Sequence, residues 1–111
     1  MTGSKFYGML GLAKRAGKIV CGTDAVIDKV RNKSAFLVII SSDVSQATNK
    51  RITDKCNFYE TTKIIYGISE ANGKAVGKTN VAAIAVTDKN FADTILRLYK
   101  NLTEVAENGS C

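Results

Sequence analysis

The chain has 111 residues, of which 45% are hydrophobic and 23% are charged, a composition typical of one globular domain that can bury its own core. No apolar run approaches the roughly 18 residues that a membrane-spanning helix needs, and the first seven residues lack the long apolar core of a signal peptide. We therefore expect one domain over residues 1–111, frayed at 1–4 and 107–111, that acts in the cytoplasm and does not bind a membrane.

The absence of histidine argues against catalysis. Histidine is the usual general base near neutral pH and the usual partner of a serine or cysteine nucleophile. The three cysteines, Cys21, Cys56 and Cys111, form no CxxC pair, so they predict neither a zinc site nor a disulfide framework. We expect no catalytic residue and no metal site.

The formal net charge of +6 lies entirely in the first half of the chain. Residues 1–55 carry ten Lys and Arg against four Asp and Glu, whereas residues 56–111 carry six of each. A one-sided basic surface is typical of a protein that binds a polyanion. Structured RNA is one such partner, and an acidic protein or ribosomal surface that docks on the basic half is the alternative. A basic face that only aids solubility would carry the same charge.

In chain order, the spacing of apolar residues predicts five helices that alternate with four strands. The expected helices span residues 5–16, 23–33, 46–58, 69–77 and 91–105, and the expected strands span residues 19–21, 35–41, 62–66 and 81–86. The strand at 35–41 is apolar throughout, which is typical of a central strand covered on both faces. This order predicts an α/β fold, a three-layer α/β/α sandwich around a mixed sheet.

Helical spacing and capping preferences give more local predictions. The buried face of the first helix is expected to hold Phe6, Met9 or Leu10, Ala13 and Ala16. Thr23 or Asp24 can cap the second helix, and Asp88 can cap the last one.

The stretch from Lys18 to Arg31 combines a short strand, a turn at Gly22 and the start of a helix. A glycine lets another backbone come close, and the N–H groups at a helix start point outward as donors. Such a place suits a phosphate or the polar edge of a nucleobase. A second turn at residues 77–80 is expected to close over the same ligand, so the sequence predicts RNA binding here.

The second turn contains Gly77-Lys78-Thr79 but does not match the phosphate-binding loop of nucleotide hydrolases. That pattern requires a glycine five positions before Gly77, where this chain has Asn72. Asp43 and Asp88 each follow a buried strand, as acids do in phosphoacceptor receiver domains. The acid pair that those domains need after the first strand is missing, so we interpret both aspartates as capping residues.

Four runs of the sequence occur in a characteristic order: Arg15-Ala-Gly-Lys-Ile-Val-Cys-Gly22, Leu37-Val-Ile-Ile40, Thr53-Asp-Lys-Cys56 followed by Phe58-Tyr59, and Gly73-Lys-Ala-Val-Gly77-Lys78. Together they resemble the kink-turn RNA-binding ribosomal protein family of the L-seven-A-e type, most of all its short stand-alone bacterial members. The resemblance covers residues 6–98. It implies an α/β/α sandwich without cofactor or catalysis that recognises a sharply bent RNA with tandem sheared G·A pairs, such as a ribosomal RNA.

In that family the glycine turn carries a Gly-x-Asn-Glu-x-x-Lys pattern that reads the guanines of the G·A pairs and nearby phosphates. On this chain the pattern falls on Gly22, Asp24, Ala25 and Asp28, so only the glycine is retained. Asp24 can still accept from a guanine edge, Ala25 loses the acceptor, and Asp28 places a negative charge where a cation would meet phosphate.

The resemblance also implies that the second turn packs on an extruded base, with Val81 in contact and with Lys78 and Asn80 near the RNA backbone. The residues that we expect to bind RNA are therefore Lys18, Gly22, Thr23, Asp24, Ala25, Asp28, Lys29, Arg31, Lys78, Thr79, Asn80 and Val81.

Overall fold

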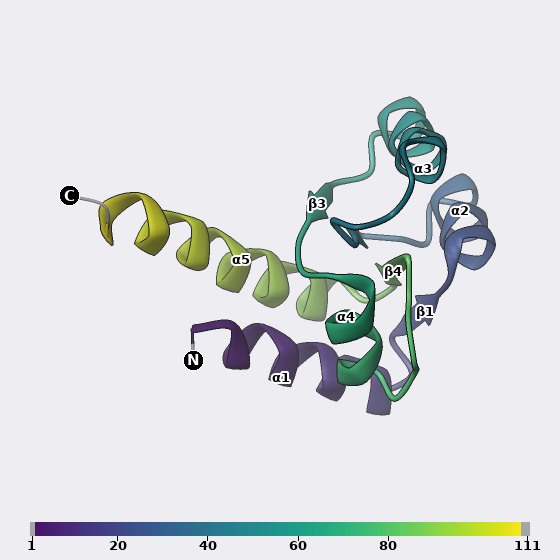
Figure 1. The fold of residues 1–111 in the computed structure, drawn as a ribbon. Helices are drawn as coiled ribbons and strands as arrows, with labels where there is room; N and C mark the ends of the chain where they lie inside the picture. Colours follow the sequence, from purple (N-terminus) through teal and green to yellow (C-terminus); the bar gives the residue numbers. More distant parts are fainter. Residues whose placement is uncertain (1, 110–111) are drawn as a thin grey trace.

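A computed structural model describes the backbone of residues 2–109 and the side chains of residues 4–102 (Figure 1). Its helices are α1 (Thr2–Arg15), α2 (Thr23–Arg31), α3 (Gln46–Tyr59), α4 (Ser69–Ala75) and α5 (Lys89–Gly109). Its strands are β1 (Ile19–Cys21), β2 (Leu37–Ile40), β3 (Lys63–Ile65) and β4 (Ala83–Val86). The predicted alternation of helices and strands is confirmed in every element.

The four strands form one mixed sheet in the order β1-β4-β2-β3. β2 and β3 are parallel, whereas β4 is antiparallel to both of its neighbours, β1 and β2. The ends of β1, β2 and β3 therefore lie at the same end of the sheet as the start of β4. We call this end the Gly22 end, because Gly22 follows β1 there.

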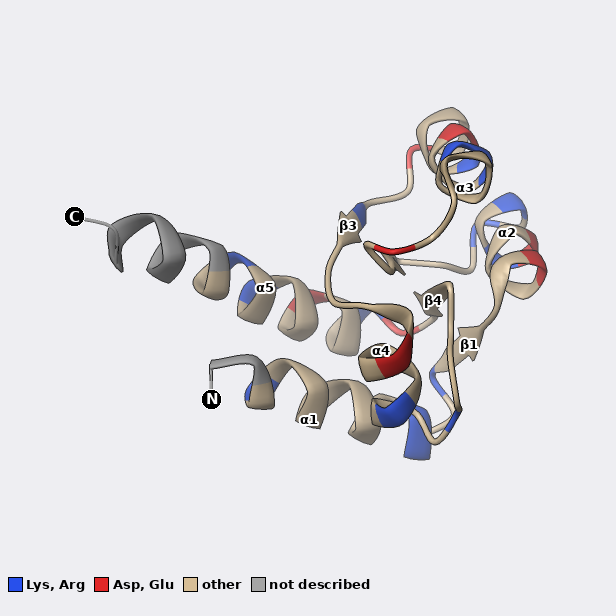
Figure 2. Ribbon diagram, viewed as in Figure 1, with Lys and Arg blue, Asp and Glu red and all other residues tan. Residues whose placement is uncertain are grey.

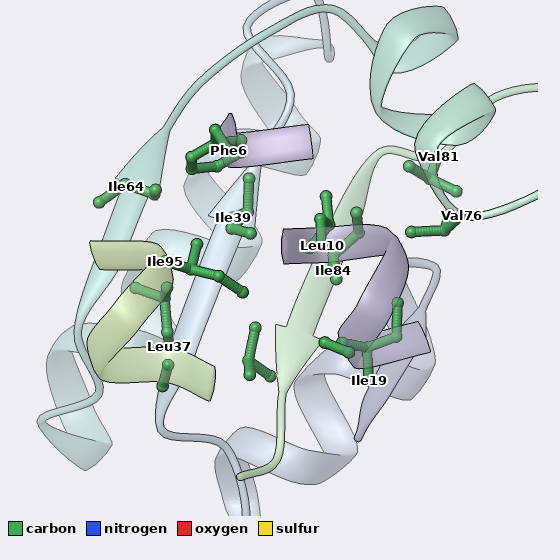
Figure 3. Packing of buried hydrophobic residues seen from close by; sticks show 13 residues of the cluster. Phe6, Leu10, Ile19, Leu37, Ile39, Ile64, Val76, Val81, Ile84 and Ile95 are labelled. Carbon is green, nitrogen blue, oxygen red and sulfur yellow. The ribbon is translucent and has the colours of Figure 1, made fainter. Parts of the chain in front are cut away.

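Helices cover both faces of the sheet, which confirms the predicted α/β/α sandwich. Because side chains alternate along a strand, Leu37 and Ile39 of β2 pack under α1, α4 and α5, while Val38 and Ile40 pack under α2 and α3. Figure 3 shows the first of these cores, where Phe6, Leu10 and Ile95 meet the strand residues Leu37, Ile39 and Ile84. All four residues of β2 are buried, as its continuous apolar run predicts.

The predictions for α1 hold for most of its inner face. Phe6, Leu10 and Ala13 are fully buried, whereas Met9 is only partly buried. The prediction for Ala16 was wrong, because α1 ends at Arg15 and Ala16 is exposed. Gly17 then reverses the chain with a φ of 73° and directs it into β1.

Both terminal helices are longer than predicted. α1 begins at Thr2 and α5 continues to Gly109, so residues 2–4 and 107–109, which we expected to be frayed, are helical. Residues 103–108 include good helix formers such as Glu and Ala. Residues 1, 110 and 111 lie outside the described part of the chain. None of the helices in that part combines the length and the apolar character that a bilayer crossing requires.

Candidate nucleic-acid interface

Gly22 joins β1 to α2 in a backbone conformation that other residues rarely adopt, with φ 101° and ψ 149°. Its N–H donates to the carbonyl oxygen of Ala83 at 3.0 Å, and its own carbonyl accepts from the N–H of Val26 at 2.9 Å. Among the described residues, no side chain caps the start of α2, and a Cβ at Gly22 would meet no atom within 4 Å. The first N–H groups of α2 therefore face an open surface that another molecule can approach.

The predicted capping of α2 by Thr23 or Asp24 was wrong. Gly22 itself is the N-cap residue, so Thr23 and Asp24 lie one step further along, inside the first helical turn. The carboxylate of Asp24 instead accepts a hydrogen bond from Nη2 of Arg51 in α3, at 2.8 Å. The corresponding prediction for α5 is confirmed, since Oδ2 of Asp88 accepts from the N–H of Phe91 at 2.9 Å.

The second predicted turn lies beside the first because β1 pairs with β4. Cys21 is opposite Ile84 in this pairing, so the loop of residues 76–82 enters the sheet next to Gly22. Lys78, Thr79 and Asn80 of this loop are exposed. The structure thus brings together the two turns that the sequence singles out.

Val81 has a different role from the one expected. Its side chain is 4% exposed and belongs to the core under α1 and α4. The prediction that Val81 packs on an RNA base is not supported by this position, because its side chain points into the protein. Val81 instead fixes the loop: its N–H donates to the carbonyl of Ser69 at 3.1 Å, and its carbonyl accepts from Oγ of Ser41 at 2.7 Å.

Two further features hold the loop of residues 76–82 in place. Gly73 of α4 lies so close to it that a Cβ there would come within 3.0 Å of backbone atoms of Asn80 and Lys78. Asn72, buried beside it, donates through Nδ2 to Oγ of Ser41 at 3.0 Å and to the carbonyl of Tyr66 at 2.8 Å. The N–H of Lys78 also donates to the carbonyl of Gly73 at 2.8 Å, so backbone atoms anchor the loop on α4.

Comparison with known proteins places this chain in a family. Residues 4–96 match the Ribosomal protein L7Ae/L30e/S12e/Gadd45 family. The chain belongs to this family. The resemblance drawn from the sequence runs is thereby confirmed at the level of the family.

Two curated relatives carry the same name. The chain is 42% identical over 101 residues to the RNA-binding protein YlxQ of Bacillus subtilis (strain 168), covering 88% of this chain and 98% of that protein. It is 39% identical over 56 residues to the RNA-binding protein YlxQ of Enterococcus faecium, covering 50% of this chain and 54% of that protein.

Solved structures agree with the fold. A protein of unknown function from Bacillus halodurans C aligns with a TM-score of 0.83 and 35% identity, covering 86% of this chain and 96% of that one. The 15.5kD RNA binding protein of Giardia lamblia aligns with a TM-score of 0.73 and 13% identity, covering 94% and 89% of the two chains. At that low identity the second likeness shows the shared fold alone.

Some residues that are close to Gly22 in the sequence, and were predicted to share its site, lie far from it in the fold. Gly22 follows β1, whereas Lys18 precedes it and accepts from the N–H of Thr87 at the other end of β4. At about 3.3 Å per residue, four residues of strand put Lys18 about 13 Å from Gly22. Lys29 and Arg31 lie in the last turn of α2, which runs back to that same far end.

The charges near the Gly22 turn are consequently not those that the sequence window indicates. In Figure 2 the acidic segments of α2 lie near its start and the basic ones toward its end. Asp24, Ala25 and Asp28 are all exposed. Basic residues from other elements lie closer to the turn: Arg51 of α3 pairs with Asp24, and Lys78 belongs to the exposed loop beside Gly22.

Lys14 and Lys78 are linked to the turn through Cys21, the last residue of β1. Burial raises the pKa of the Cys21 thiol, while the positive charges of Lys14 and Lys78 oppose that shift. Both cations therefore lie close enough to act on Cys21. Arg51 was not among the expected site residues, because only the packing of α3 beside α2 brings it to this end.

Proposed function

We propose that this protein binds a kinked or internally looped RNA through the start of α2 and the loop of residues 76–82, and that it acts in translation or ribosome biology in the cytoplasm. The observation that carries the proposal is the open Gly22 turn, whose helix-start N–H groups lie beside an exposed polar loop. Membership of a ribosomal protein family supports it, as do the two relatives that are named RNA-binding proteins.

The geometry suits an irregular RNA element better than a regular duplex of RNA or DNA. Proteins read RNA mainly at unstacked and irregular elements, because the deep groove of an A-form helix excludes side chains. Uncapped N–H groups at a helix start can donate to a phosphate or to a guanine edge. An irregular RNA element can bring a phosphate or a guanine edge up to Gly22, because a Cβ built on this glycine would meet no other atom within 4 Å.

The departures at Ala25 and Asp28 affect affinity rather than the approach to the turn. A charge-assisted hydrogen bond contributes about 1.5–3 kcal/mol, or roughly 10- to 150-fold in affinity. Ala25 has no side-chain acceptor to offer, and Asp28 is an exposed acid on the same helix. We therefore expect binding that is selective for kinked RNA but weaker than it would be with an acceptor and a cation at these positions.

The proposal is tested by a gel-shift titration of a kink-turn RNA and a straight duplex of equal length, each at two salt concentrations. A clear preference for the kinked RNA is the expected result. Equal, weak and strongly salt-dependent binding to both RNAs would refute the proposal, because a basic surface alone behaves in this way. That outcome would favour the docking of an acidic protein or ribosomal surface instead.

A pair of glycine variants tests whether Gly22 is the contact point. Gly17, with φ 73° and open space within 4 Å of the position a Cβ would take, lies at the far end of β1 and is the matched control. Gly17→Val and Gly22→Val both force a side chain onto a backbone with positive φ, which costs roughly 1–3 kcal/mol of stability. Only Gly22→Val is expected to lose the preference for kinked RNA, and an equal loss in both variants would refute the site assignment.

A further inference from the structure

The start of α2 lacks a cation of its own. The only charged residues from Thr23 to Asp28 are the acids Asp24 and Asp28, and the basic residues Lys29 and Arg31 occur in the last turn. A helix of nine residues is about 13 Å long, so these two cations are remote from the Gly22 turn. An RNA phosphate near the turn must therefore be neutralised from a neighbouring element.

Arg51 of α3 is placed to do this. Its Nη2 donates to Oδ1 of Asp24 at 2.8 Å, although the two residues are 27 positions apart in the sequence. α2 and α3 pack against each other and both begin at the Gly22 end of the sheet. The guanidinium is thus held by a residue of the first turn of α2, the turn whose N–H groups have no side-chain cap.

Both partners of this pair remain accessible to a ligand. The side chain of Arg51 is 55% exposed and that of Asp24 is 85% exposed. An arginine carries five N–H donors in a planar fork that matches phosphate in a bidentate manner. The contact with Asp24 engages Nη2, and an arginine also carries donors on Nη1 and Nε that can bind a phosphate.

We propose that Arg51 is an RNA-binding residue that donates to a phosphate of the RNA docked at Gly22. This inference rests on the proposed function. The Asp24 carboxylate holds the guanidinium beside the turn in the free protein. An exposed ion pair contributes about 0–1 kcal/mol to stability, so Arg51 can exchange the carboxylate for a phosphate at little cost to the fold.

Arg51 would complete a set of cations on both sides of the turn. Lys14 belongs to α1, and the N–H of Lys78 donates to the carbonyl of Gly73 in α4 at 2.8 Å, so both residues belong to the side of the sheet that α1 and α4 cover. Arg51 belongs to α3, on the opposite face. An RNA strand that passes over Gly22 would meet positive charge from Lys78 on one side and from Arg51 on the other.

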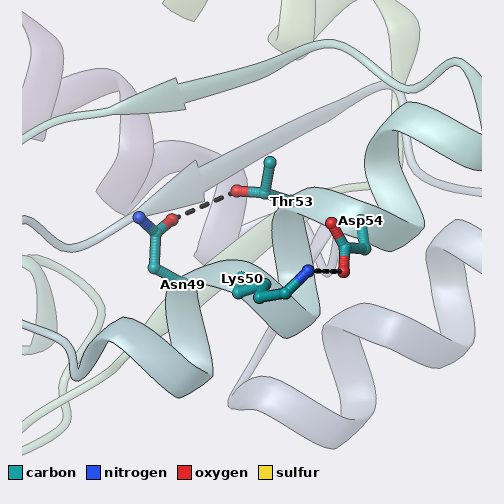
Figure 4. A network of polar contacts seen from close by, with 4 residues as sticks. All are labelled: Asn49, Lys50, Thr53 and Asp54. Carbon is teal, nitrogen blue, oxygen red and sulfur yellow. Dashed lines mark hydrogen bonds and ion pairs between the residues drawn. The ribbon is translucent and has the colours of Figure 1, made fainter.

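The neighbouring Lys50 provides a matched control for this proposal. Lys50 is also exposed on α3, but its Nζ pairs with Oδ2 of Asp54 one turn along the same helix, at 2.9 Å (Figure 4). Arg51→Gln and Lys50→Gln therefore remove the same charge from the same helix, each with the loss of one exposed ion pair. They differ in whether the charge lies beside the Gly22 turn.

The experiment is a titration of both variants and the wild-type protein with a kink-turn RNA over a range of salt concentrations. We expect Arg51→Gln to weaken binding by about tenfold or more and to reduce the slope of log K against log salt by about one, as the loss of one phosphate contact does. Lys50→Gln is expected to weaken binding by less than about threefold, which corresponds to a screened surface charge. Thermal unfolding of both variants should match that of the wild type.

Equal losses of affinity in Arg51→Gln and Lys50→Gln would overturn the proposal, because they would show only the effect of net charge. In that case the wild-type protein would still prefer kinked RNA to a straight duplex, and the proposed function would stand. A wild-type protein without this preference would refute the proposed function, and the role of Arg51 with it. Arg51→Lys, which keeps the charge but loses the bidentate fork, should recover part of the affinity.

Discussion

Replacement of Asn72 by alanine tests whether a buried polar network supports the loop of residues 76–82. The side chain of Asn72 is 1% exposed and makes three hydrogen bonds. Its Nδ2 donates to Oγ of Ser41 at 3.0 Å and to the carbonyl of Tyr66 at 2.8 Å, and its Oδ1 accepts from Oη of Tyr7 at 2.7 Å. Ser41 in turn donates to the carbonyl of Val81, so the network links α1 and α4 to the loop.

The magnitude follows from the number of bonds that are lost. Each hydrogen bond contributes about 1 kcal/mol to stability, and a buried group left without a partner costs about 1–3 kcal/mol. Asn72→Ala removes three bonds and leaves the Tyr66 carbonyl without its side-chain donor, so we expect a loss of about 3–4 kcal/mol. Most domains have only about 5–15 kcal/mol of stability, which makes this loss easy to detect.

Urea denaturation of the wild type, Asn72→Ala and Asn49→Ala measures the effect. Asn49 of α3 is the control, since it is only partly buried and accepts one hydrogen bond, from Oγ1 of Thr53 at 3.1 Å (Figure 4). Its replacement is expected to cost about 1 kcal/mol or less. If Asn72→Ala lost no more stability than Asn49→Ala, the network would not anchor the loop.

Three other variants test separate parts of the structure. Asp88→Ala removes the cap of α5 and should lower the free energy of unfolding in urea by about 1 kcal/mol; an unchanged value would refute the capping role. The backbone N–H and hydroxyl of Ser69 hold the pKa of the Asp43 carboxyl below its usual value. The ionised Asp43 carboxylate therefore stabilises the folded protein at pH values above its unfolded pKa near 4, and this contribution is lost as the pH falls through its lower pKa in the folded protein. Asp43→Asn should accordingly make the free energy of unfolding fall less steeply between neutral and acidic pH. Asp28→Lys should tighten binding to kinked RNA in a gel shift, whereas weaker binding would show that this face of α2 is not directed at RNA.

The layers of the fold are readable from the sequence, but the order of the strands is not. The continuous apolar run of β2 requires cover on both faces, and the helical spacing of Phe6, Leu10 and Ile95 identifies two of the covering helices. The insertion of β4 between β1 and β2 depends on pairing between segments about 45–65 residues apart. No local pattern in β4 specifies these partners or its antiparallel direction, because small apolar residues fit either arrangement.

The sequence predicts the Gly22 turn but does not show which side chains surround it. A glycine between a strand and a helix is a local signal, and its positive φ confirms why it is needed. The preference of aspartate for helix starts is also a local signal, yet the Asp24 carboxylate forms an ion pair with Arg51 of α3 instead of capping α2. Lys18 and Arg31 are close to Gly22 in sequence, but an extended strand and a helix carry them to the far end of the sheet.

At this site the open backbone and the positive charges come from different parts of the chain, so two different binding measurements can report on them. The Gly22 turn contributes backbone donors and free space but no cation, whereas Arg51, Lys14 and Lys78 contribute charge from three other elements. Phosphate contacts determine the salt dependence of affinity, and contacts with an irregular RNA element determine preference. Gly22→Val should therefore lower the ratio of affinities for kinked and straight RNA while the salt slope on the straight duplex stays unchanged. Arg51→Gln should reduce the salt slope on kinked RNA, and an unchanged slope would show that Arg51 does not contact a phosphate.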